Sequence, residues 1–139
     1  MKILLNRKNK AFHYTATNED GVSSELDGTK DIGGEDKGLR PMQLLLAGAG
    51  GCSAIDILLI LKKQKQEVED LQIEVDGERE QGKEPALWKK VHLIFKFKGK
   101  VEKEKAQRAA DLSMEKYCSV AETLRRAGAE ISWEVQVSG

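Results

Sequence analysis

The sequence has few of the residues that build disulfide frameworks or metal sites. It holds two cysteines and two histidines, and none of them stands in a CxxC or HxxxH spacing. A zinc site is therefore not expected, and neither is a disulfide-stapled scaffold. Prolines number only two while 40% of the residues are hydrophobic, which excludes a disordered chain.

An excess of charge of one sign is also missing. Lys plus Arg and Asp plus Glu number 23 each, so no overall field favours nucleic acid or an anionic membrane as a partner. The N-terminal apolar patch ends at Arg7, too soon for the core of a signal peptide. We therefore expect a cytoplasmic protein, where cysteines are more often free, catalytic or redox-sensing than structural.

The chain does contain one long apolar stretch, residues 41–66. Pro41 suits the first position of a helix, and the sequence predicts a helix over roughly 41–65. Apolar residues occur all round this helix, which in a soluble protein indicates cover on nearly every side. Cys52, near its middle, is expected to be mostly hidden.

The same stretch meets the length rule for a membrane span. Three glycines, Ser53 and Asp56 interrupt it, it stands alone, and charged segments surround it, so a core helix is favoured over a span. Glycine disfavours helix by about 1 kcal/mol relative to alanine. The glycines at 48, 50 and 51 therefore indicate that a backbone or a ligand comes close just before Cys52.

In the remaining segments, apolar residues either alternate with polar ones, as in strands, or recur at helical spacing. These patterns predict an α+β fold in a single domain, 1–139. An antiparallel meander is expected first and a hairpin follows the apolar helix. His92 falls on the polar face of its strand, where a solvated side chain is the main expectation and a ligand or base role the alternative. Strands are predicted at 2–5, 10–17, 22–26, 71–76, 90–97 and 131–137, helices at 101–113 and 117–126, and a loop at 27–39.

Two residues carry most of the possible chemistry, Cys52 and Cys118, which lie 66 positions apart. Burial alone would make Cys52 inert, whereas Cys118 comes at the start of a helix, where free N–H groups favour a thiolate. Spacing alone leaves open whether the two are unrelated core thiols or a pair.

Asp56 stands one helical turn after Cys52 and so shares its helix face. A carboxylate there opposes thiolate formation unless a cation or a hydrogen-bond donor offsets it. The sequence does not choose among the candidate cations, which are Arg7, Arg40, Arg79, Arg125 and Arg126.

Several motifs together resemble the OsmC/Ohr family of thiol peroxidases, and most closely its OsmC-like branch. They are RPM at 40–42, LLL at 44–46, GGCSAID at 50–56, LS at 112–113 and EKYCSV at 115–120. The likeness covers nearly the whole chain, and the two cysteine motifs come in the family's order.

The resemblance implies an interlocked homodimer with antiparallel sheets around a long buried cysteine-bearing helix and active sites at the subunit interface. Cys52 matches the thiol that attacks a hydroperoxide, and Cys118 the thiol that resolves it as a disulfide. A dithiol such as dihydrolipoamide would reduce the disulfide, with no cofactor or metal. The implied role is an oxidative stress response against organic hydroperoxides.

The chain departs from the family pattern at the groups that activate the first thiol. Peroxidases of this family place a glutamate in the segment matching 41–43, which here reads Pro-Met-Gln. The N-terminal turn offers Glu19 and Asp20 where an arginine is expected. The alternative is therefore a non-catalytic member that binds a small apolar or electrophilic molecule at the dimer interface.

Overall fold

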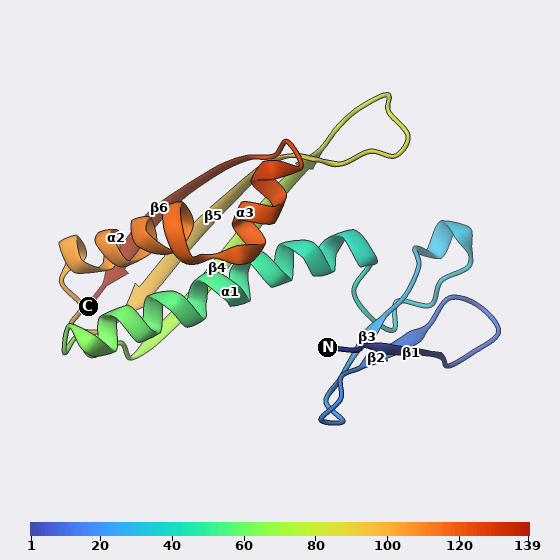
Figure 1. Cartoon of the computed structure of the whole chain (residues 1–139), viewed down its shortest axis with the longest axis horizontal. Coiled ribbons are helices and arrows are strands. Elements are labelled where there is room, and N and C mark those ends of the chain that lie inside the picture. The colour runs from blue at the N-terminus through green and yellow to red at the C-terminus, as the bar shows by residue number, and fades with distance from the viewer. The chain divides into compact units, whose positions relative to one another are not determined.

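A computed structural model describes residues 1–139 and shows an α+β protein with two small sheets (Figure 1). The strands are β1 (Leu4–Arg7), β2 (Tyr14–Thr17), β3 (Ser23–Leu26), β4 (Asp70–Arg79), β5 (Trp88–Lys98) and β6 (Glu130–Ser138). The helices are α1 (Pro41–Lys63), α2 (Lys103–Leu112) and α3 (Ser119–Arg126), with a short 3-10 helix η1 (Lys30–Ile32) and a π turn η2 (Ser113–Tyr117).

The three N-terminal strands form one antiparallel sheet in the order β1-β2-β3, and the other three form a second sheet in the order β4-β5-β6. The predicted meander and hairpin are confirmed, but β6 pairs with β5 in parallel rather than antiparallel. The reason is the connection, because the chain crosses over through α2, η2 and α3 before it re-enters the sheet.

The chain divides into two compact units, Met1–Leu45 and Leu46–Gly139. The first holds the β1-β2-β3 sheet and the loop after it, and the second holds most of α1 with the β4-β5-β6 sheet, α2 and α3. A single domain over 1–139 remains a prediction.

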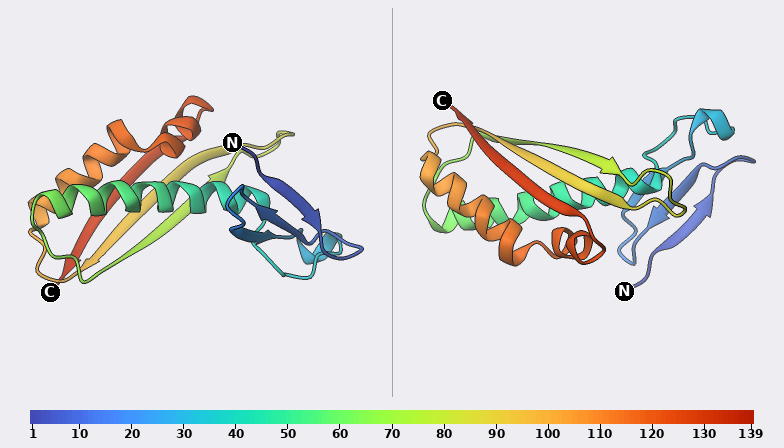
Figure 2. Two further views of the ribbon diagram at one scale, coloured as in Figure 1. Left: turned by 60° about the horizontal axis from the view of Figure 1, so that its bottom comes forward. Right: turned by 90° about the horizontal axis from the view of Figure 1, so that it is seen from above.

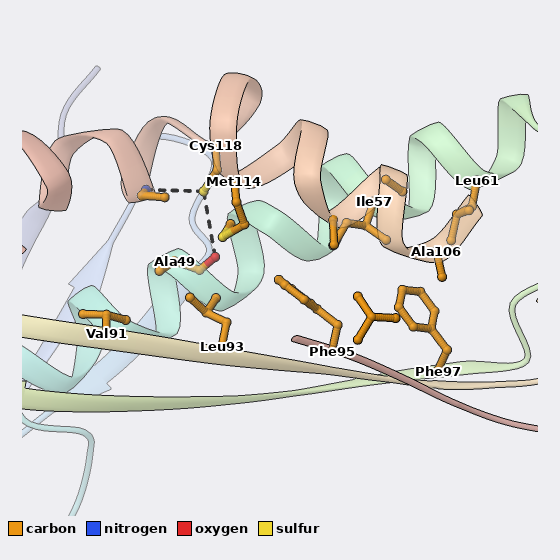
Figure 3. Packing of buried hydrophobic residues seen from close by; sticks show 14 of the residues in the cluster. Ala49, Ile57, Leu61, Val91, Leu93, Phe95, Phe97, Ala106, Met114 and Cys118 are labelled. Atoms are coloured by element: carbon orange, nitrogen blue, oxygen red, sulfur yellow. Dashed lines mark hydrogen bonds between the residues drawn. The ribbon is translucent and has the colours of Figure 1, made fainter. Parts of the chain in front are cut away.

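The core of the C-terminal unit lies between one face of β4-β5-β6 and the three helices, which all cover that face (Figures 1 and 2). Strand β5 supplies the inward row predicted from its alternation, and all four side chains are at most 1% exposed. Figure 3 shows these side chains pointing at α1 and the helices beyond it. The row consists of Val91, Leu93, Phe95 and Phe97.

Helix α1 begins at Pro41 as predicted, but one chain covers only a stripe of it. The buried positions recur one turn apart, at Ala49, Ser53, Ile57 and Leu61, with Gly50 beside them. On the other side Ile55, Leu58 and Leu59 are 63%, 43% and 56% exposed. The expectation of cover on nearly every side is therefore wrong for the single chain, because one three-stranded sheet and two short helices reach only one face.

By length and composition, α1 is the one helix that is apolar enough to cross a membrane. Within the chain, 28% of its most apolar window is buried, and the core helix of a soluble protein passes the same test. Its buried stripe belongs to the hydrophobic core that β5 and α2 complete.

The N-terminal strands differ from the prediction, since β1 has the predicted length but lies two residues later, and β2 and β3 are shorter. Residues 8–13 form a turn instead of the start of β2, because the Asn9 side-chain oxygen accepts the N–H groups of Ala11 at 2.9 Å and His13 at 3.2 Å. A side chain that captures backbone N–H groups in this way competes with the strand ladder.

The predicted loop at 27–39 is built around Asp27, which is only 1% exposed. Its carboxylate accepts the backbone N–H groups of Gly28 at 2.7 Å, Glu35 at 3.1 Å and Lys37 at 3.1 Å. The loop closes tightly, since a Cβ on Gly34 would lie 2.0 Å from the carbonyl oxygen of Gly28. The segment before α1 is thus an ordered turn with a polar centre.

Candidate functional site

Cys52 lies in the fourth turn of α1 and is half-buried. Two glycines precede it with different surroundings. A Cβ on Gly50 would lie 3.1 Å from Cγ2 of Val75, so glycine there lets α1 pack closely against β4. A Cβ on Gly51 would meet nothing within 4 Å, so this side of the helix next to Cys52 is open within the chain.

Cys118 is the N-cap residue of α3 and is 3% exposed. Its sulfur accepts the N–H of Ala121 at 3.4 Å, as an N-cap side chain does. Its thiol donates toward the carbonyl oxygen of Ala49 on α1 at 3.9 Å, and Figure 3 shows the sulfur between these two groups. The side chain is therefore fixed against the same helix that carries Cys52.

The two thiols, distant in the sequence, are neighbours in the fold, and both are free. The pKa of the Cys118 thiol is raised from an ordinary value of 9.0 to about 11. Burial is the largest cause, and a hydrogen bond with Cys52 and the charge of that group add to it, while the backbone N–H groups of Ala121 and Val120 act in the opposite direction. Cys118 is thus a protonated thiol at neutral pH. The expectation that its place at a helix start makes it acidic is wrong, because desolvation outweighs the N–H groups.

A second contact joins α1 to the segment before Cys118. Asp56 is half-buried, and its Oδ2 accepts a hydrogen bond from Oγ of Ser113 at 3.0 Å. The group that offsets the Asp56 carboxylate beside Cys52 is therefore a hydrogen-bond donor, the Ser113 hydroxyl, and not a cation. Ser113 was not singled out in the sequence, and the only signal for it was its place in the LS motif ahead of EKYCSV.

The five candidate cations all bind other groups. Arg125 and Arg126 pair with Glu122 at 2.6 and 2.9 Å, and this shared pairing lowers the pKa of the Glu122 carboxyl. The other three make their contacts as follows: Arg7 with the carbonyl oxygens of Lys10 and Ala11, Arg40 with Asp36, and Arg79 with the carbonyl oxygen of Ala86 and the ring of Trp88.

A surface hollow of about 330 Å³ adjoins Cys118. Polar and charged side chains line most of it, and Lys116 and Arg126 contribute positive charge. The other lining residues are Tyr117, Cys118, Ser119, Glu122 and Thr123. No group of three His, Cys, Asp or Glu side chains is placed to hold a metal ion.

His92 lies on the outer, polar face of β5, as predicted from the alternation. Its ring nitrogens contact Ser132 Oγ at 2.7 Å and Glu134 Oε2 at 3.2 Å, and the hydrogen bond with His92 lowers the pKa of the Glu134 carboxyl. The three side chains are exposed or half-exposed on the sheet face opposite the core, away from both thiols.

Comparison with known proteins places these residues in a family. The model of the OsmC-like protein family matches residues 34–134, which include both cysteines. Protein YhfA of Escherichia coli K12 is 45% identical over 93 residues, which cover 66% of this chain and 69% of YhfA.

Solved structures agree with the fold. A hypothetical protein from Aquifex aeolicus is 34% identical, with a TM-score of 0.80 over 99% of this chain and 97% of its own. An organic hydroperoxide resistance protein OsmC from Legionella pneumophila has a TM-score of 0.72 over 99% of this chain and 98% of its own, at 19% identity. The second likeness concerns the fold alone.

Proposed function

Because the chain belongs to the OsmC-like protein family, we propose that it is a thiol-dependent peroxidase that reduces organic hydroperoxides with Cys52 and Cys118. The observation that carries this proposal is the pairing of the two thiols from separate elements, with Cys118 fixed against α1. Several proteins of the same fold are described as organic hydroperoxide resistance proteins.

The thiolate of Cys52 attacks the terminal oxygen of the hydroperoxide and breaks the O–O bond. The sulfur becomes a sulfenic acid, and the alkoxide leaves and takes a proton as an alcohol. The thiol of Cys118 then attacks the sulfenic sulfur, a disulfide forms, and the hydroxyl leaves with the thiol proton as water. A dithiol of the dihydrolipoamide kind reduces the disulfide by exchange and becomes a cyclic disulfide.

The division of labour between the thiols follows from their environments. Cys118 keeps its proton at neutral pH because burial raises its pKa to about 11, which makes it a poor first nucleophile and a thiol able to supply the proton for the departing water. Cys52 is the more accessible of the two, and the helix surface at Gly51, the residue before it, is open within the chain. These features support attack by Cys52 and resolution by Cys118.

We further propose that the working unit is a cytoplasmic homodimer that acts in the response to oxidative stress. The exposed apolar side chains of α1 support a second copy as their cover, since Ile55, Leu58 and Leu59 lie on a side of α1 that the chain's own sheet and helices leave uncovered. A second copy on this side of α1 would also keep water away from the helix surface next to Cys52. Such a dry surface favours apolar hydroperoxides as substrates.

One observation favours a second function, the binding of a small apolar or electrophilic molecule without turnover. The five arginines considered as activators of Cys52 all contact other groups of the chain, although Arg40 does so only through a 3.8 Å ion pair with Asp36 that leaves its buried Nε without a partner. Without a cation at the thiol, attack on a peroxide is slow, whereas a thiol beside an apolar surface still captures electrophiles.

Single mutants separate the roles. With one equivalent of cumene hydroperoxide, Cys118→Ser should form a sulfenic acid at Cys52 that dimedone traps, and Cys52→Ser should stay reduced on the same timescale. Wild type with dihydrolipoamide should consume peroxide above a buffer blank. Oxidation of Cys118 in the Cys52→Ser variant would reverse the roles, and no reaction in any variant would leave the binding function.

A further inference from the structure

Two side-chain contacts join α1 to the segment that carries Cys118, and they lie one turn apart on the helix. The first is the pair of thiols, and the second is the hydrogen bond from Ser113 Oγ to Asp56 Oδ2 at 3.0 Å. Asp56 follows Cys52 by four residues, so the two side chains share a face of α1. The contact at Asp56 is therefore next to the reacting pair without being part of it.

Ser113 also holds Cys118 through the backbone. The N–H of Cys118 donates to the carbonyl oxygen of Ser113 at 2.7 Å and closes the π turn η2. Arg125 donates to the next carbonyl oxygen, that of Met114, at 2.8 Å. Single π turns of this kind are frequently found at functional sites. Here the turn ends at Cys118 and sets its position as the N-cap of α3.

The burial of Ser113 makes its hydroxyl dependent on Asp56. Ser113 is 0% exposed, so without Asp56 its hydroxyl would lose this partner without gaining water. Loss of this contact would free the start of the π turn from α1 and leave Cys118 less restrained toward Cys52.

We propose that Asp56 and Ser113 are positioning residues for the resolving step, which fix the π turn so that Cys118 stays opposite Cys52. The hydrogen bond, rather than the charge of Asp56, performs this role. This inference rests on the proposed two-thiol cycle, but it concerns disulfide formation and does not require that the oxidant be a peroxide.

The test is the equilibrium of the Cys52–Cys118 disulfide with glutathione in the full chain. Glutathione disulfide oxidises the two protein thiols to the disulfide and is released as two molecules of glutathione, so the equilibrium constant in this direction is the effective concentration of one thiol toward the other. Ser113→Ala and Asp56→Ala should each lower this constant about tenfold, the size of effect expected from losing one buried hydrogen bond. The double variant with both substitutions should lower the constant no further than either single one, because both changes remove the same contact.

Two further variants separate positioning from charge and from general stability. Asp56→Asn keeps an acceptor oxygen for Ser113 and should stay within about twofold of wild type, a small shift for a retained hydrogen bond. Asp111→Ala removes another half-buried carboxylate, which accepts from Trp133 Nε1 at 2.9 Å between α2 and β6. It should destabilise the fold but leave the disulfide equilibrium unchanged.

Several outcomes would overturn the inference. The inference fails if Asp56→Ala leaves the equilibrium constant for disulfide formation unchanged. It also fails if Asp56→Asn or Asp111→Ala lowers that constant as much as Asp56→Ala does. If Ser113→Ala fails to fold, Asp56→Ala with Asp56→Asn still decides the matter. A wild type that forms the disulfide but consumes no peroxide would sink the proposed function alone, whereas a wild type that forms no disulfide would sink both.

Discussion

The two compact units of this chain are organised by different forces. In the C-terminal unit, 46–139, apolar side chains from α1, β5, α2 and α3 form one buried core. In the N-terminal unit, 1–45, the one buried residue is Asp27, and large apolar side chains such as Leu4, Phe12 and Val22 are exposed. A three-stranded sheet without a covered hydrophobic face is marginal in water. The contrast indicates that the N-terminal unit needs cover that its own 45 residues do not supply.

Matched phenylalanine substitutions should show the contrast most strongly. Phe95 is 0% exposed in the core of the C-terminal unit, whereas Phe12 is 43% exposed. Phe95→Ala should lower the free energy of unfolding by about 3–5 kcal/mol, because it leaves a cavity. Phe12→Ala should lower it by less than about 1 kcal/mol in a monomer. Denaturant unfolding followed by circular dichroism measures both, and a large, concentration-dependent loss in Phe12→Ala would mean that a second copy covers this residue.

The next largest effect should come from the uncovered side of α1. We expect the wild type to scatter light as a dimer, near twice 15.4 kDa, at micromolar concentration. Ile55 is 63% exposed in the single chain, and Ile55→Lys should weaken dimerisation by about 30-fold or more, as for a central interface residue. Gln64→Lys, an exposed position just after α1, is the control and should leave the mass unchanged. A monomeric wild type would contradict the interlocked dimer.

Sequence patterns predicted the C-terminal unit more accurately than the N-terminal one, and for a physical reason. The alternation in β5 is set by burial, and Val91 and Phe97 lie in the core as expected. In the N-terminal unit, strand ends depend on single polar side chains such as Asn9, which ends the strand pattern by binding backbone N–H groups. Alternation carries no information about such bonds.

At the site, local reasoning identified both cysteines but misjudged Cys118. A helix start favours a thiolate only where water still reaches the sulfur, and the burial of Cys118 under α1 was not visible in its own segment. The hydrogen-bond acceptors of Cys118 are the backbone carbonyl oxygens of Ala49 and Ser113, which a residue of any type could supply. The family resemblance, which rests on separated motifs, supplied the pairing that spacing left open.

The buried thiol makes the stability of the C-terminal unit sensitive to alkaline pH. The pKa of Cys118 is raised to about 11 by burial, from 9.0, so the folded chain keeps a proton that the unfolded chain loses. Its contribution is fully present below about pH 9 and is lost as the pH rises toward about 11, by roughly 2 kcal/mol. Urea midpoints at pH 8 and pH 10.5 should therefore fall further in wild type than in Cys118→Ser. An equal fall would show that Cys118 ionises normally.

The smallest effect should be local and at the acid end, in the loop of the N-terminal unit. Desolvation raises the pKa of the Asp27 carboxyl, but the N–H groups of Lys37, Glu35 and Gly28 outweigh it and hold the pKa below 3.8. This contribution is present above pH 3.8 and is lost as the pH falls through the lowered value. Hydrogen exchange should thus show the amides of Glu35 and Lys37 losing protection in acid before those of β5.

Asp27→Asn is the variant that tests this assignment. An amide side chain offers one acceptor oxygen in place of two, so it satisfies fewer of the three N–H groups and no longer titrates. We expect faster exchange at Glu35 and Lys37 at neutral pH, with no added sensitivity to acid, and unchanged exchange at Leu93 in the core. If wild type and variant exchange alike, the loop does not depend on the carboxylate. If Leu93 also exchanges faster, the stability of the two units is coupled, and the contrast between them is smaller than the difference in their buried residues indicates.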